Sequence, residues 1–118
     1  MRIGILGDVH EEGIKILKEK KFELLNITNF DKSNLKNELA NVDGIILRTS
    51  NLDSDILSHC NKLKIISRHG VGYDNVDKNF LLNNKIALAI TSTSNAVSVA
   101  EHVMTMFLTL TKNIYKSD

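Results

Sequence analysis

The sequence predicts an α/β fold with a parallel five-stranded sheet, helices on both faces and one long C-terminal helix. Short aliphatic runs alternate along the chain with segments of helical spacing, which is the pattern of repeated βα units. The last segment differs from the rest because it is apolar around most of its helical circumference. With 118 residues, of which 42% are hydrophobic and 25% charged, the chain suits one globular core.

The elements follow one another in β-α order. Five strands are expected at residues 2–6, 23–26, 44–47, 64–67 and 86–90, and four helices at 11–20, 36–40, 54–59 and 77–83. Crossovers between parallel strands are right-handed, and consecutive elements tend to be neighbours, so we expect the strand order 2-1-3-4-5. This is the flavodoxin-like form of a Rossmann-like sheet.

The final helix is predicted at residues 96–114. A helix that is apolar on nearly all sides must be covered on nearly all sides, and the preceding domain can cover one flank only. Glu101 and His102 lie one turn from its start and its apolar length is marginal, so it is a poor membrane span. We expect a second domain or a second copy of the chain to cover it. Its apolar positions are Val97, Val99, Ala100, Val103, Met104, Met106, Phe107, Leu108, Leu110 and Ile114.

The domain boundary is expected at the hydroxyl-rich stretch 91–94, because such residues favour turns and helix starts. Residues 1–94 then form one domain, and residues 95–118 open another. The net charge of +1, without a long basic run, disfavours nucleic acid as a partner. The single cysteine, Cys60, can form no internal disulfide, and no signal peptide precedes Asp8, so a cytoplasmic location is expected.

Gly70-Val71-Gly72 follows a predicted strand and invites a dinucleotide-binding interpretation. The third glycine of that fingerprint is replaced by Asn75, and no acidic residue ends the next strand, which reads Ala-Ile-Thr at 89–91. Two alternatives remain open. The backbone N–H groups of Val71 and Gly72 could form a nest for a carboxylate, or the segment could be a tight turn before the helix at 77–83.

Two further positions suit an anion. Arg48 closes the third strand, where open α/β sheets bind ligands, although an arginine at such a position is more often solvated. Residues 95–101 start the long helix, whose free N–H groups attract anions, while Ser98 and Glu101 also fit a capping box. The four histidines lie in different elements without metal-ligand spacing, so no metal site is expected.

Two segments, S-R-H-G-V-G-Y-D-N-V-D at 67–77 and N-A-V-S-V-A-E at 95–101, together resemble the D-isomer-specific 2-hydroxyacid dehydrogenases, in particular the phosphoglycerate dehydrogenase-like branch. The resemblance implies that Val71 and Gly72 bind the substrate carboxylate through their backbone. It also implies that Arg48 and Thr49 contact the substrate, that the Asn95 side chain hydrogen-bonds it, and that Val71 lies against the nicotinamide. Relatives carry a proline before the asparagine, where this chain has Thr and Ser.

The resemblance covers nearly the whole chain but only about the first third of a full enzyme. It implies NAD as cofactor and a small acid such as 3-phosphoglycerate or hydroxypyruvate/glycerate as substrate. The apolar helix at residues 96–114 separately leads us to expect a homodimer formed through that helix. The NAD-binding G-x-G-x-x-G loop and the catalytic Arg, acidic residue and His lie downstream in relatives, so the chain alone is expected to transfer no hydride. Two alternatives are a stand-alone flavodoxin-like binding or regulatory module and a self-associating non-catalytic remnant. A receiver-like module would need an Asp where Arg48 stands and a Lys where Thr91 stands.

Overall fold

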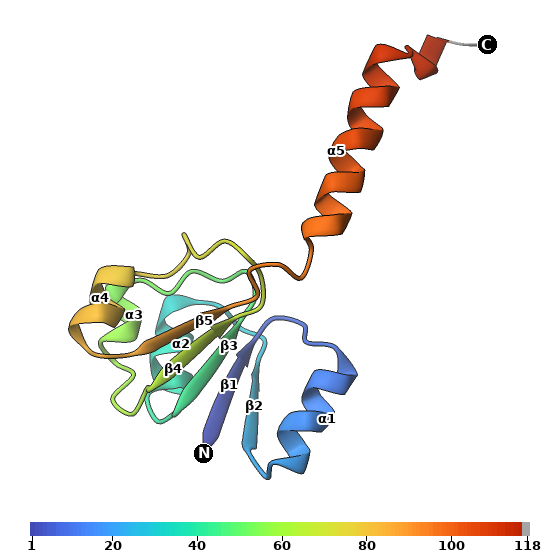
Figure 1. The fold of residues 1–118 in the computed structure, drawn as a ribbon. Helices are drawn as coiled ribbons and strands as arrows, with labels where there is room; N and C mark the ends of the chain where they lie inside the picture. The colour runs from blue at the N-terminus through green and yellow to red at the C-terminus, as the bar shows by residue number, and fades with distance from the viewer. Residues whose placement is uncertain (117–118) are drawn as a thin grey trace.

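The computed structural model describes residues 1–116 as a parallel sheet with flanking helices, followed by a helix that projects away from them (Figure 1). The strand order is β2-β1-β3-β4-β5, as predicted, and every pairing is parallel. The predicted strand ends agree with the observed ones to within one residue. The strands are β1 (Arg2–Leu6), β2 (Glu23–Ile27), β3 (Gly44–Leu47), β4 (Ile65–Arg68) and β5 (Ala87–Ile90).

The helices are α1 (Glu11–Glu19), α2 (Lys32–Leu39), α3 (Ser54–Leu57), α4 (Lys78–Asn83) and α5 (Ala96–Thr111), with a 3-10 turn η1 (Ile114–Lys116). The predicted start of α2 was wrong: the helix begins at Lys32, four residues earlier, because Leu35 and Leu39 anchor it to the core one turn apart. The long helix also ends before residue 114, since Asn113 adopts a φ of 50° there.

The main core lies between one face of the sheet and the three helices α2, α3 and α4. Side chains alternate along each strand, and one set from every inner strand points toward these helices. Fully burying a Leu or Ile side chain contributes about 1.5–3 kcal/mol, so this layer supplies much of the stability of the fold. Its least exposed members are Leu6, Leu35, Leu39, Val42, Ile45, Leu47, Leu52, Leu57 and Ile66.

The opposite face of the sheet is covered near β1 by α1. Ile3 and Ile5 of β1 are buried but lie outside the main core, and Ile14 of α1 lines the same hollow as Ile5. Helices therefore flank both faces, as the βα pattern predicted, with α1 on one side and α2 to α4 on the other.

The α5 helix makes the molecule elongated. The radius of gyration is 18.2 Å, whereas a compact chain of this length has about 13–14 Å. None of the residues of α5 is buried, and Val97 and Leu110 are 72% and 73% exposed. The expectation that the preceding domain covers one flank was therefore wrong: the helix leaves the carboxyl end of β5 and points into open space (Figure 1). Within residues 1–116, no helix has the length and apolar character needed to cross a bilayer.

Candidate functional site

All the candidate binding residues lie in loops that follow strands. Arg48 and Thr49 come after β3, Val71 and Gly72 after β4, and Asn95 after β5. Because the strands are parallel, their carboxyl ends meet at one edge of the sheet, which is where open α/β sheets bind ligands. The topology therefore places all five residues on the same edge.

Arg48 is held beside the turn that follows β1. Its backbone N–H donates to the Leu6 carbonyl at 3.0 Å, and its Nη1 lies 3.5 Å from the Asp8 carbonyl oxygen and 3.9 Å from Asp8 Oδ2. The close approach requires a glycine at position 7. Gly7 has a φ of +104°, and a Cβ on it would lie 2.9 Å from Arg48 Cβ.

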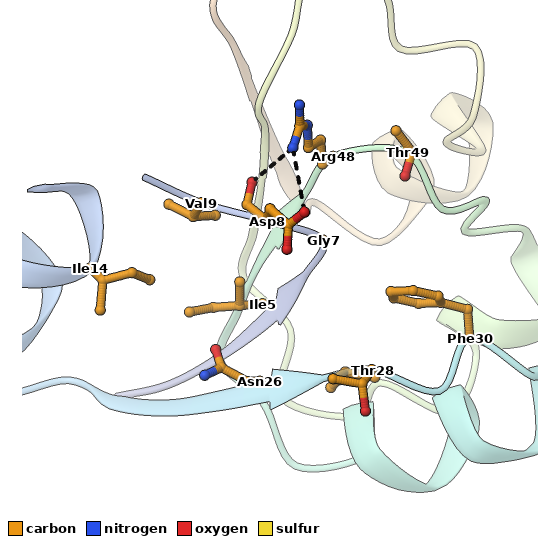
Figure 2. A pocket seen from close by; sticks show the side chains of 11 residues that line it. Ile5, Gly7, Asp8, Val9, Ile14, Asn26, Thr28, Phe30, Arg48 and Thr49 are labelled. Atoms are coloured by element: carbon orange, nitrogen blue, oxygen red, sulfur yellow. Dashed lines mark hydrogen bonds and ion pairs between the residues drawn. The ribbon is translucent and has the colours of Figure 1, made fainter. Parts of the chain in front are cut away.

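A hollow of about 630 Å³ opens beside Arg48 and Thr49 at the carboxyl ends of β1, β2 and β3 (Figure 2). The chain runs from β1 outward to β2 and then back across to β3, so the hollow lies at a topological switch point. Figure 2 shows Ile14 and Phe30 on opposite sides of it. Its lining residues are Ile5, Gly7, Asp8, Val9, Ile14, Asn26, Ile27, Thr28, Phe30, Arg48 and Thr49.

The hollow gathers only part of the predicted site. Arg48 and Thr49 line it, whereas Val71, Gly72 and Asn95 lie elsewhere on the same edge. Sequence reasoning missed Asp8, because its proximity to Arg48 depends on the pairing of β1 with β3. The glycine and aspartate directly after the first strand were the available signal, since a polar turn at the switch point is a candidate ligand contact.

The loop between β4 and α4 divides into two halves with different roles. Its second half is structural: Asn75 Nδ2 donates to the Ser50 carbonyl at 2.7 Å, Val76 is buried, and the Asp77 carboxylate caps α4 by accepting from Phe80 N at 3.0 Å. The Asn75 bond ties this loop to the one that follows Arg48. The prediction of a tight turn before the helix is therefore confirmed for this half.

The first half of the loop is exposed, and two of its backbone N–H groups make no hydrogen bond within the described chain. Val71 is 39% exposed and Gly72 is also exposed. Among the hydrogen bonds of residues 1–116, none engages the backbone N–H of Val71 or Gly72. Two adjacent unengaged N–H groups can donate hydrogen bonds to a carboxylate, so the nest interpretation retains its physical basis.

Asn95 occupies the N-cap position of α5, but its side chain makes no capping hydrogen bond. The exposed amide is therefore available to a ligand. Ser98 lies inside the first turn of the helix, so the alternative in which it forms a capping box with Glu101 is wrong.

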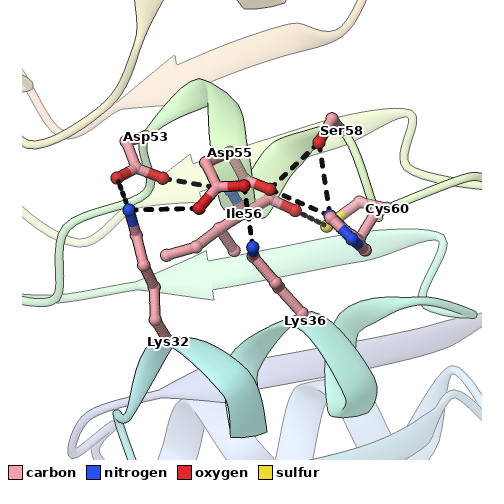
Figure 3. Close-up of polar contacts among 8 residues, drawn as sticks. Lys32, Lys36, Asp53, Asp55, Ile56, Ser58 and Cys60 are labelled. Carbon is pink, nitrogen blue, oxygen red and sulfur yellow. Dashed lines mark hydrogen bonds and ion pairs between the residues drawn. The ribbon is translucent and has the colours of Figure 1, made fainter.

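A network of charged side chains joins α2 to the start of α3. Lys32 Nζ bridges Asp53 at 2.7 Å and Asp55 at 3.2 Å, and Lys36 binds Asp55 at 2.7 Å, which joins α2 to α3 (Figure 3). Hydrogen bonds from Lys32 and from Ile56 N lower the pKa of Asp53, while Lys36 and then Lys32 lower that of Asp55. Cys60, three residues after the end of α3, is buried, and burial raises the pKa of its thiol to about 11.

The charge network has a structural role because it joins α2 to α3. The Cys60 thiol also has a structural role, as part of the hydrophobic core. Among residues 1–116, no cluster of three or more His, Cys, Asp or Glu side chains is arranged to hold a metal ion.

The fold and this edge define a class of protein: a flavodoxin-like domain with two unengaged N–H groups in one edge loop and an arginine beside a switch-point hollow. The family model for the D-isomer specific 2-hydroxyacid dehydrogenase catalytic domain matches residues 3–116. The chain belongs to this family, as the two sequence motifs indicated.

Relatives agree with this membership. The chain is 27% identical to the D-3-phosphoglycerate dehydrogenase of Archaeoglobus fulgidus over its whole length, which covers 23% of that protein. It is 30% identical to the D-3-phosphoglycerate dehydrogenase of Methanocaldococcus jannaschii, over 97% of the chain and 22% of the relative. The chain thus spans about a quarter of the length of these relatives.

Solved structures show the same fold. The NAD⁺-bound 3-phosphoglycerate dehydrogenase of Entamoeba histolytica matches all of the chain with a TM-score of 0.84 and 28% identity, over 41% of that structure. The NAD-dependent formate dehydrogenase of Staphylococcus aureus, in complex with NAD, matches 98% of the chain with a TM-score of 0.83 and 25% identity, over 40% of that structure.

The segment 70–75 departs from the dinucleotide-binding fingerprint. Gly70 and Gly72 lack the third glycine of that fingerprint, and Asn75, which stands in its place, donates to the Ser50 carbonyl.

Proposed function

We propose that the chain is the substrate-binding part of an NAD-dependent D-2-hydroxyacid dehydrogenase that acts on a small acid of the phosphoglycerate or hydroxypyruvate/glycerate type. The observation that carries this proposal is the pair of unengaged N–H groups at Val71 and Gly72, on the sheet edge that also holds Arg48. Residues 1–94 form the substrate domain, and residues 95–118 lead into a nucleotide-binding domain.

Each residue has a separate part in holding the acid. The Val71 and Gly72 N–H groups bind the carboxylate, while the Arg48 guanidinium and the Thr49 hydroxyl contact the remainder of the substrate. The Asn95 amide hydrogen-bonds the substrate from the start of α5. Val71 also faces the nicotinamide, and NAD, when bound, supplies the hydride acceptor.

These residues position the acid and fix its orientation; they do not exchange a proton with it. The chain alone is accordingly proposed to transfer no hydride. To test this, the purified chain is mixed with NADH and a panel of 2-oxo acids at neutral pH. We expect the NADH absorbance at 340 nm to stay constant, and a steady, enzyme-dependent decrease would contradict the proposal.

Binding of the acid is tested separately by NMR. The ¹⁵N-labelled chain is titrated with hydroxypyruvate and with 3-phosphoglycerate, and we expect saturable shifts of the Val71 and Gly72 amide signals. Arg48→Met should weaken the binding, whereas Arg2→Met, which removes the same charge at the opposite edge of the sheet, should not. Unperturbed Val71 and Gly72 signals with every acid would refute the assignment of this loop.

The partner of α5 is proposed to be a second domain together with a second copy of the chain, as a homodimer. The support is the continuous apolar surface of the helix, including Phe107 at 60% exposure and Leu110 at 73%. Sedimentation velocity should show the chain self-associating, and the double variant Phe107→Ser/Leu110→Ser should reduce the association. A monomer that binds no hydrophobic dye would contradict this proposal.

A further inference from the structure

A second arginine, Arg68, lies directly at the turn that carries the unengaged amides. It is the last residue of β4 and is half-buried. Its Nη1 donates a hydrogen bond to the carbonyl of the next residue, His69. The guanidinium therefore folds back over its own loop instead of extending into solvent.

Gly70 and Arg68 fit each other closely. A Cβ at position 70 would overlap Arg68 Nη1 and would lie 2.9 Å from Cζ and 3.1 Å from Nη2. Gly70 also has a φ of +152°, which side-chain-bearing residues rarely adopt. The glycine thus allows both the backbone turn and the close approach of the guanidinium.

The same turn is tied to both neighbouring strands. His69 N donates to the Leu47 carbonyl at 2.8 Å, and Thr91 N donates to the Gly70 carbonyl at 3.2 Å. Two buried polar atoms, Arg68 Nε and Thr91 Oγ1, have no hydrogen-bond partner within the described chain. Buried polar groups in native folds usually have a protein or water partner, so these two atoms leave hydrogen-bonding capacity at this turn for a ligand or a water molecule.

We propose that Arg68 is a positioning residue that holds the His69–Gly70 peptide so that the Val71 and Gly72 N–H groups face a carboxylate. The direction of these two N–H groups depends on the rotation of the preceding peptides, which the guanidinium fixes through the His69 carbonyl. Its positive charge, which lies against Gly70 in the same turn, also favours an anion. The part of this inference that concerns the ligand rests on the proposed function.

The first test needs no ligand. Backbone ¹⁵N relaxation is measured on the wild type, Arg68→Met, Arg68→Lys and the control Lys64→Met, which removes a charge at the other end of the same strand segment. We expect the order parameters of Val71 and Gly72 to fall from roughly 0.85 to below about 0.6 in Arg68→Met only. Arg68→Lys retains a donor and a charge and should recover most of the order.

The second test measures affinity for hydroxypyruvate by the NMR titration described above. Loss of the guanidinium should weaken binding roughly tenfold or more, as expected when a charge-assisted interaction is removed. Arg68→Lys should lie between the wild type and Arg68→Met. If Arg68→Lys loses less affinity than Arg68→Met, the positive charge restores binding. Packing of the side-chain stem alone would not produce this difference between the two variants.

The outcomes separate the two proposals. Order parameters and affinity that remain unchanged in Arg68→Met would overturn the role of Arg68 while leaving the carboxylate site intact. If the wild type binds no acid, the proposed function fails, and the relaxation data still decide whether Arg68 holds the turn. Should Arg68→Met not fold, Gly70→Ala replaces it: the added Cβ displaces the guanidinium, and an ordered Val71–Gly72 segment in that variant would refute the inference.

Discussion

Substituting Gly7 with Ala should be among the most damaging single-methyl changes in this chain. Gly7 directly follows β1 with a φ of +104°, and the added Cβ would lie 2.9 Å from Arg48 Cβ. Both atoms belong to rigid parts of the chain, so neither can move without shifting the backbone. The change should therefore destabilise the fold and displace Arg48 from the hollow beside it.

The magnitude follows from two contributions. Holding a residue other than glycine in a sparsely populated backbone region costs about 1–3 kcal/mol. Forcing a methyl group into a well-packed position costs typically about 1–3 kcal/mol more. A total loss of about 2–6 kcal/mol is a large part of the roughly 5–15 kcal/mol by which native domains are stable.

The assay is urea unfolding followed by circular dichroism at pH 7. With a slope of about 2 kcal/mol/M, the middle of the usual range for urea, the midpoint should fall by roughly 1–3 M at an unchanged slope. Gly13→Ala is the matched control: Gly13 lies in helix α1, and its Cβ would meet only the Val9 side chain, at 3.1 Å. Alanine is intrinsically favoured in helices, so this variant should stay within about 1 kcal/mol of the wild type. Equal midpoints for Gly7→Ala and Gly13→Ala would refute the reasoning.

Three further predictions concern the α2–α3 side of the molecule. Leu39→Ala removes a fully buried side chain and should lower the free energy of unfolding by about 2–5 kcal/mol in the same urea assay. The control Leu82→Ala changes a side chain that is 79% exposed and should be nearly neutral. Similar losses of stability in the two variants would contradict the assigned core. Because Lys32 and the Ile56 N–H lower the pKa of Asp53, its carboxylate stabilises the fold above the unfolded pKa, and this contribution is lost as the pH falls through the folded pKa. Asp53→Asn should therefore lose less stability than the wild type between pH 7 and pH 2.5, as measured by thermal unfolding at both values, and an identical loss would show that the ion pair is irrelevant. The buried Cys60 thiol, with its pKa raised to about 11, should react with iodoacetamide at pH 8 far more slowly in the native chain than in urea, and rapid native labelling would show that the site is open.

Sequence periodicity was sufficient for the sheet but not for every helix. The strands are short aliphatic runs bounded by turn residues, and the handedness of crossovers restricts their order, so the arrangement β2-β1-β3-β4-β5 could be predicted. The start of α2 could not, because Lys32, Ser33 and Asn34 show no apolar period. Only the contacts of Leu35 and Leu39 with the core reveal that the helix begins there.

Part of the candidate site was predicted from two short motifs. Val71, Gly72 and Asn95 lie in contiguous segments whose pattern resembles the family, and the prediction that they bind substrate remains to be tested. The hollow beside Arg48 was not foreseen, since Asp8, Asn26 and Phe30 come from separate loops that meet only when the strands pair.

The amino-acid sequence alone therefore determined the order of the strands and the edge at which their carboxyl ends meet, because hydrophobic periodicity and chain chirality act locally. The tertiary structure alone decided that Asp8 lies beside Arg48, that Arg68 folds over Gly70, and that no part of the preceding domain covers α5. The Asp8–Arg48 contact and the path of α5 depend on how the whole sheet assembles, while the fold of Arg68 over Gly70 depends on the rotamer and backbone angles adopted in the native turn; the pattern of residue types specifies none of these.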